Sequence, residues 1–166
     1  ESIRELLLSH SDDAPSAKTE LLLMFAARAQ HLKTKILPAL EAGTWVICDR
    51  FTDATYAYQG GGRELPLDWI EMLETLVQGA KRPDLTLIFD VPVALGLCRA
   101  GRRGALDRIE SEDLAFFERV RAMYQQIASR ETDRVVMLDA SSDVESVTES
   151  MISLLMTRWN LSCRPG

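Results

Sequence analysis

The sequence is poor in the residues that disulfide frameworks and zinc sites require. Its 166 residues include three cysteines and two histidines. The cysteines, Cys48, Cys98 and Cys163, are an odd number and form no Cys-x-x-Cys pair. This usage argues against a disulfide framework and against a Cys/His zinc site, and it is typical of reduced thiols in a cytoplasmic protein.

Long apolar runs and an excess of positive charge are also lacking. No stretch reaches the roughly 20 apolar residues of a transmembrane helix, and no signal peptide is visible. The net charge of −6 argues against nonspecific binding of nucleic acid, although it leaves room for a local basic patch. We therefore expect neither a membrane nor a nucleic acid as partner. The chain has the length of one domain, and 46% hydrophobic residues are enough for a core.

Helical and strand-like patterns alternate along the chain. Apolar and β-branched runs predict buried strands at residues 44–48, 85–89 and 135–138. Strands that are separated by helices predict an α/β layer fold with a parallel sheet flanked by helices. The predicted helices are residues 1–8, 17–42 (with a kink near Pro38 and an end at Gly43), 53–59 (broken by Gly60 to Gly62), 67–80, 93–100, 113–129 and 144–159.

Polar side chains stand where the predicted strands end, and ligands of open α/β sheets bind at the carboxyl ends of strands. Asp49 and Arg50 follow strand 44–48, and Asp90 and Asp139 follow the other two. A fixed guanidinium can hold a phosphate with two hydrogen bonds. The carboxylate of Asp49 can hold that arginine or a metal-bound water. The alternative is an ordinary ion pair between the strand end and a neighbouring helix.

A second candidate site lies in the apolar stretch that ends at Arg28. Seven apolar residues, 21–27, indicate a helix that is buried on nearly every side. A charge at the end of this stretch requires a partner or a cavity. Phe25 and Arg28 share one helix face, and a ring beside a guanidinium suits a planar base. The alternative is that Phe25 belongs to the core and Arg28 pairs with an acid.

Residues 99–110 form a third candidate site because they hold four arginines in an acidic chain: Arg99, Arg102, Arg103 and Arg108. Two glycines within the segment predict mobility. A mobile arginine-rich segment between helices suits phosphoryl transfer, where cations close over the transferring phosphate and exclude water. The alternative is a solvated run of charge at the end of a helix.

Together these stretches resemble the bacterial thymidylate kinase family, which belongs to the P-loop nucleoside monophosphate kinases. The resemblance runs from about Glu1 to Trp159. It implies a single kinase domain over residues 1–166, with a three-layer P-loop NTPase-type fold and a lid at about residues 99–112. It also implies a cytoplasmic homodimer, with residues 21–25 and 67–76 as candidate contacts. The resemblance rests on residues 22–31, 49–51, 58–63, 83–87, 89–92 and 106–110.

The resemblance also implies roles for the phosphate-binding and catalytic residues. Arg50 would bind the 5′-phosphate of dTMP, with Arg4 as a second contact. Asp49 would lie near Mg²⁺ and reach it through a water. The lid would cover ATP and supply the catalytic arginine, for which Arg99, Arg102, Arg103 and Arg108 all stay candidates.

Further residues match positions at which the family binds the nucleoside. Arg28 would donate to a thymine carbonyl, and Thr55 would lie against the thymine edge with Gln59 nearby. Tyr58 would crowd the 2′ position of the sugar and favour deoxyribose. Glu110 would lie on the sugar side of the lid. The base-stacking phenylalanine of the family falls at Met24 here, so that Phe25 or the thioether of Met24 would cover the base.

The P-loop sequence Gly-x-x-x-x-Gly-Lys-Ser/Thr does not occur in these residues. The P-loop holds the ATP phosphates and Mg²⁺. The resemblance therefore implies an upstream βαβ unit of roughly 30 residues that is not in this sequence, and the activity of these residues by themselves stays open. The implied reaction is transfer of the ATP γ-phosphoryl group to dTMP, which gives dTDP and ADP, in dTTP biosynthesis. The alternatives are a deoxynucleoside kinase of the same fold and an inactive nucleotide-binding fragment.

Overall fold

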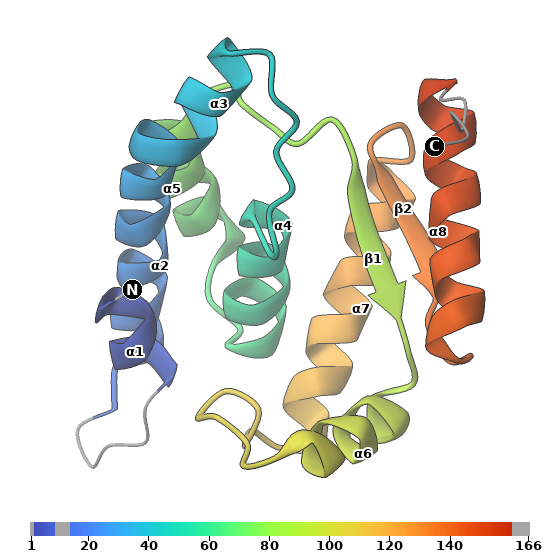
Figure 1. Ribbon diagram of the computed structural model, residues 1–166. Coiled ribbons are helices and arrows are strands. Elements are labelled where there is room, and N and C mark those ends of the chain that lie inside the picture. The colour runs from blue at the N-terminus through green and yellow to red at the C-terminus, as the bar shows by residue number, and fades with distance from the viewer. Residues whose placement is uncertain (1, 9–13, 161–166) are drawn as a thin grey trace.

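The computed structural model describes residues 2–8 and 14–160 and has helices on both sides of a small parallel sheet (Figure 1). The sheet pairs β1 with β2, in a register that runs from Thr86 opposite Val135 to Asp90 opposite Asp139. The elements are α1 (Ser2–Leu8), α2 (Ala17–His31), π-helix η1 (Leu32–Ile36), α3 (Leu37–Glu41), α4 (Thr52–Thr55), π-helix η2 (Tyr56–Gly62), α5 (Leu67–Gln78), β1 (Thr86–Asp90), α6 (Val93–Arg103), α7 (Leu114–Arg130), β2 (Val135–Asp139) and α8 (Val144–Trp159).

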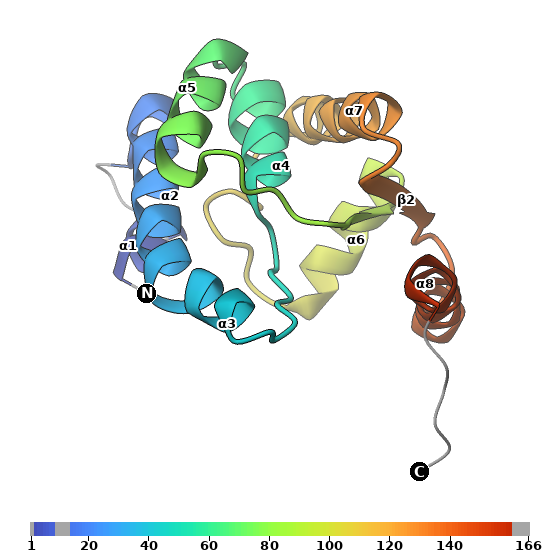
Figure 2. The ribbon, with the colours of Figure 1, turned by 90° about the horizontal axis from the view of Figure 1, so that it is seen from above.

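The predicted strands at residues 85–89 and 135–138 are confirmed as β1 and β2. Figure 2 shows α7 and α8 on opposite faces of the sheet, which gives the expected layers. A core cluster of Ile88, Ile127 and Val135 joins β1, α7 and β2. None of the helices in the described part of the chain combines the length and the apolar character that crossing a bilayer requires.

The predicted long helix at residues 17–42 is confirmed as the continuous run of α2, η1 and α3. Ser16 caps its start, because the side chain of Ser16 accepts a hydrogen bond from the backbone N–H of Thr19. The π-helical turn η1 ends at Ile36, two residues before Pro38, whose ring and missing N–H disfavour a regular α-helical turn there. Gly43 ends the run with a φ of +73°, a conformation that glycine adopts without strain.

The predicted buried strand at residues 44–48 is wrong. This segment runs as an extended connection between α3 and α4 (Figure 1), and the side chains of Trp45 and Ile47 are 65% and 98% exposed. An extended segment becomes a strand only when a neighbour pairs with its N–H and C=O groups. Among the described residues β1 and β2 pair with each other, and no strand pairs with residues 44–48.

The prediction that Gly60 to Gly62 break the helix at residues 53–59 is wrong, because the three glycines continue that helix as part of η2. They bring η2 against its neighbours more closely than any side chain would allow. A Cβ atom on Gly61 would lie 2.8 Å from the Cβ of Met123 and 2.9 Å from the backbone oxygen of Arg119. A Cβ atom on Gly62 would lie 2.5 Å from the ring of Phe116. The glycines are therefore required by helix packing.

This packing predicts that Gly61→Ala destabilises the protein by about 1 to 3 kcal/mol, because the added methyl group meets backbone that cannot yield. The measurement is chemical denaturation of both proteins. Gly101→Ala is the matched control, because Gly101 lies in α6 with nothing within 4 Å of the added methyl group. The control should be neutral or slightly stabilising. Equal stabilities for the two variants would contradict the packing account.

Candidate functional site

Arg28 on α2 is a partly buried cation that forms no ion pair with the described residues. Its Nη2 donates to the backbone oxygen of Phe51 at 3.3 Å and to Oγ1 of Thr55 at 2.8 Å. Its Nη1 is buried and has no hydrogen-bond partner among the described residues. Burial lowers the pKa of Arg28 to about 10, so the side chain stays charged at neutral pH. A buried donor without an acceptor is costly, and this one indicates a site for a ligand with an acceptor oxygen.

Two aromatic rings lie beside the Arg28 guanidinium. Its central carbon is 4.7 Å from the ring centre of Phe25 and 5.2 Å from that of Phe51. Phe25 is only 1% exposed and packs with Leu21 and Ile70, so it belongs to the core. Phe51 is partly exposed, and it is a residue of this site that sequence reasoning missed. Its position directly after Arg50 was the available signal.

Arg50 and Tyr58 form the exposed side of the site. The Arg50 guanidinium lies 4.9 Å from the ring centre of Tyr58, and that ring packs edge-on against Phe116 and Tyr124. Arg50 has a φ of 64°, in the left-handed region that residues other than glycine rarely adopt. Such strain persists when the surroundings impose it, and it concentrates at functional sites. Asp49 stands exposed beside it.

Two predicted site residues, Gln59 and Arg108, belong instead to a network around Glu20, which is 1% exposed. Gln59 donates to Oε1 of Glu20 at 2.7 Å, and Arg108 donates to Oε2 at 2.5 Å. Arg63 bridges Glu20 and Glu112. Burial raises the pKa of Glu20, but the hydrogen bonds from Arg108 and Gln59 and the charge of Arg63 outweigh it, and the pKa lies below its ordinary value.

The remaining predicted arginines differ in their contacts. Arg108 also donates to the backbone oxygen of Leu7, which ties its segment to α1. Arg99 on α6 donates to the backbone oxygens of Ala140, Ser141 and Ser142, in the loop after β2. Arg4 on α1 and Arg102 on α6 are exposed. The side chain of Arg103 and all of Cys163 lie outside the described residues, and Cys48 and Cys98 are free thiols.

The carboxylates of the site do not gather into a metal centre. Among the described residues no group of three His, Cys, Asp or Glu side chains could hold a metal ion. Both oxygens of Asp90 accept hydrogen bonds from Arg121, at 2.7 and 2.8 Å. Glu110 accepts from the backbone N–H of Asp107 at 3.2 Å. The site is therefore organised by guanidinium groups, with Asp49 as its exposed carboxylate.

One cavity lies apart from these residues. A shallow groove of about 300 Å³ between η2 and α7 is lined by Gly61, Leu65, Met123 and their neighbours. None of the predicted site residues lines it.

Comparison with known proteins agrees on one family. The family model described as thymidylate kinase matches residues 1–151. A thymidylate kinase from Pseudomonas putida (strain W619) is 59% identical over 155 residues, which are 93% of this chain and 75% of that protein. One from Alcanivorax borkumensis is 54% identical over 161 residues, 96% of this chain and 77% of that protein. The crystal structure of thymidylate kinase from Ehrlichia chaffeensis superimposes with a TM-score of 0.73 at 31% identity, covering 93% of this chain and 72% of that one.

The Glu20 network predicts a dependence of stability on pH. Because the pKa of Glu20 in the folded protein is below the ordinary value of 4.5, its contribution is present above that pH and is lost as the pH falls further. Glu20→Gln should cost about 2 to 4 kcal/mol at pH 7 and flatten the loss of stability below about pH 4.5. Denaturation between pH 7 and 3 measures this, with Glu149→Gln on the exposed face of α8 as control. Parallel pH profiles for wild type and Glu20→Gln would contradict it.

Proposed function

Because the chain belongs to the thymidylate kinase family, we propose that it transfers the γ-phosphoryl group of ATP to dTMP, giving dTDP and ADP. Thymidylate kinases use ATP as the phosphate donor. The observation that carries the proposal is the unpaired Nη1 of Arg28, buried beside Thr55. It is a donor that is placed for a neutral base with carbonyl oxygens.

The thymine base would occupy the space at Arg28. Nη1 donates to a carbonyl oxygen of the base, and Thr55 holds Nη2 so that the guanidinium keeps its orientation. A neutral carbonyl does not compensate the positive charge of Arg28, but the two aromatic rings beside the guanidinium stabilise that charge. Phe51 and Met24, both partly exposed, are better placed than Phe25 to cover the base, since Phe25 is enclosed in the core.

Arg50 would bind the 5′-phosphate of dTMP, with Arg4 as the second contact. Arg50 takes part in no ion pair among the described residues and rests on the ring of Tyr58, so its donors are available to a phosphate. Tyr58 is buttressed by Phe116 and Tyr124 and would limit room at the 2′ position of the sugar. Gln59 would stabilise the site indirectly, because its side chain donates a hydrogen bond to Glu20.

The segment at about residues 99–112 would act as the lid over ATP. Arg99 and Arg108 are engaged with backbone oxygens and with Glu20, which makes the exposed Arg102 the stronger candidate for the catalytic arginine among the described side chains. Arg99 also links α6 to the loop after β2, which makes that loop a candidate for the adenine side. Glu110 would lie toward the sugar.

The chemistry assigned to the chain is alignment and charge stabilisation. Arg50 fixes the acceptor phosphate, a lid arginine meets the charge that develops on the transferring group, and lid closure excludes water. Mg²⁺ would supply further charge neutralisation at the phosphates. An exposed carboxylate such as Asp49 fits an indirect contact, because Mg²⁺ usually keeps several of its waters.

A homodimer through α2 and α5 is part of the proposal. Leu22 on α2 and Met72 and Leu76 on α5 are 53%, 66% and 78% exposed, and the two helices pack side by side (Figures 1 and 2). Exposed apolar residues on adjacent helices favour a contact with another protein surface. The free thiols of Cys48 and Cys98 support the reducing cytoplasm as its location.

The base contact predicts that Arg28→Met raises the KM for dTMP at least about tenfold while the melting temperature is kept or raised. Methionine fills the space without a buried unpaired charge, and such replacements are often neutral or stabilising. Steady-state kinetics and thermal denaturation of the same samples check both parts. An unchanged KM for dTMP would remove Arg28 from the base site.

The rival function is phosphorylation of a deoxynucleoside by a kinase of the same fold. Arg50→Ala should raise the KM for dTMP and lower turnover together, each about tenfold or more, because a phosphate contact serves both binding and alignment. Arg130→Ala, an exposed arginine at the end of α7, is the matched control. Wild-type activity on thymidine but not on dTMP would support the rival.

A further inference from the structure

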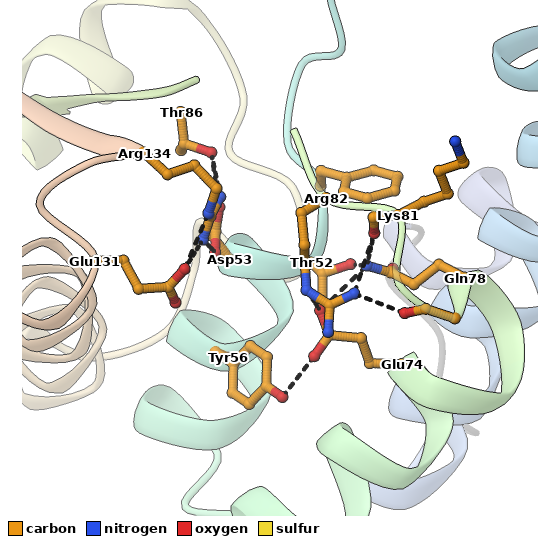
Figure 3. A network of polar contacts seen from close by, with 12 residues as sticks. Thr52, Asp53, Tyr56, Glu74, Gln78, Lys81, Arg82, Thr86, Glu131 and Arg134 are labelled. Carbon is orange, nitrogen blue, oxygen red and sulfur yellow. Dashed lines mark hydrogen bonds and ion pairs between the residues drawn. The ribbon is translucent and has the colours of Figure 1, made fainter. Parts of the chain in front are cut away.

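An ion pair outside the proposed site fixes the helix on which the site is built. The carboxylate of Asp53, in the first turn of α4, faces the guanidinium of Arg134 with both oxygens (Figure 3). The distances are 2.8 Å from Oδ2 to Nη1 and 2.8 Å from Oδ1 to Nη2. Oγ1 of Thr86 donates to the same carboxylate at 2.8 Å. This two-bond geometry fixes the orientation of Asp53 as well as its distance.

The partners of Asp53 stand at the start of the sheet. Thr86 is the first residue of β1, Arg134 directly precedes β2, and the backbone N–H of Thr86 donates to the backbone oxygen of Arg134 at 2.9 Å. Glu131 accepts from Nε and Nη2 of Arg134, at 2.9 and 2.7 Å, which holds the guanidinium from its other side. The pair therefore ties α4 to the place where both strands begin.

A second set of contacts holds the same turn from the opposite side. Oγ1 of Thr52 donates to the side-chain oxygen of Gln78 at 2.6 Å, and the hydroxyl of Tyr56 donates to Glu74 at 2.8 Å. Arg82 pairs with Glu74 at 2.9 Å. Consecutive residues of α4 are thus anchored to α5 on one side and to the sheet on the other (Figure 3).

The pair is largely buried, since the side chains of Arg134 and Asp53 are 15% and 11% exposed. Burial raises the pKa of Asp53, but hydrogen bonds from Arg134 and Thr86 outweigh it and hold the pKa below its ordinary value. A buried ion pair contributes little net stability, because desolvation offsets the attraction. Its contribution here is geometric.

We propose that the Asp53–Arg134 pair is a positioning device that sets Arg50 for the acceptor phosphate. The inference rests on the proposed function. Asp53 lies three residues after Arg50 and two before Thr55, so the backbone on both sides of the anchor carries residues of the site. A tilt of α4 would move the guanidinium of Arg50 relative to the phosphate while leaving the lid in place. Loss of the pair should therefore weaken the binding of dTMP and leave the binding of ATP unchanged.

The test compares Asp53→Asn, Arg134→Gln and the double variant of the full-length protein. Each single variant should raise the KM for dTMP roughly ten- to a hundredfold with the KM for ATP unchanged, because small misplacements at a reacting centre have effects of that size. The double variant should be no worse than either single, because the two groups act as one unit. Arg134→Lys, which keeps the charge but loses the two-bond geometry, should fall between wild type and Arg134→Gln.

Two controls separate positioning from loss of stability. Glu149→Gln, on the exposed face of α8, leaves the Asp53–Arg134 pair and Glu131 in place and should keep a normal KM for dTMP. Ile36→Val destabilises a buried position in η1, which packs mainly against α2 and α3, and it too should leave this KM unchanged. If Asp53→Asn does not fold, Thr86→Val takes its place in the test. This variant removes one donor to Asp53 and one acceptor of Arg134, and a smaller rise in the KM for dTMP is expected.

A folded Asp53→Asn protein with the wild-type KM for dTMP would overturn the positioning role. An equal rise in the KM for ATP, or an equal rise in Ile36→Val, would also overturn it. A wild-type protein that does not phosphorylate dTMP would overturn the proposed function itself, and this inference with it.

Discussion

The close approach of η2 to α7 is the contact on which the rest of this structure depends. Gly61 and Gly62 let the two helices meet at distances that a single methyl group would prevent. α7 packs on β2, and η2 continues directly from α4. The contact between η2 and α7 therefore fixes where the candidate acceptor site lies relative to the sheet. The Asp53–Arg134 pair fixes the other end of the same helical run. The site is thus held by packing at one end and by charge at the other.

The arginines of this acidic chain fall into two groups. Arg63, Arg108 and Arg134 are partly buried and each meets a carboxylate, so their charges hold elements together. Arg28 and Arg50 take part in no ion pair among the described residues and rest on aromatic rings instead. From the sequence, Arg28 and Arg50 are candidate ligand contacts because each follows an apolar run, with an ordinary ion pair as the alternative for both. The sequence did not separate Arg108 from that group, because its partner lies 88 positions away.

The pattern of apolar and β-branched residues predicted correctly those strands that have a neighbouring strand to pair with among the described residues. Two apolar, β-branched runs form the strands β1 and β2 because their backbones pair with each other. The run at 44–48 has the same composition, yet it is exposed, because a pattern predicts burial without supplying the neighbouring strand. The glycines at 60–62 were interpreted as helix breakers, since a missing side chain weakens a helix and permits close packing alike. The ion pair that anchors α4 joins residues 81 positions apart, a distance over which sequence periodicity carries no information.

The central claim is that the unpaired guanidinium of Arg28 and the exposed guanidinium of Arg50 together receive dTMP. A crystal structure of the protein with dTMP bound tests it most directly. The account predicts a thymine carbonyl oxygen within hydrogen-bond distance of Nη1 of Arg28 and the 5′-phosphate on Arg50. A nucleotide bound elsewhere, with Nη1 of Arg28 still unpaired or turned toward a carboxylate of the protein, would contradict it.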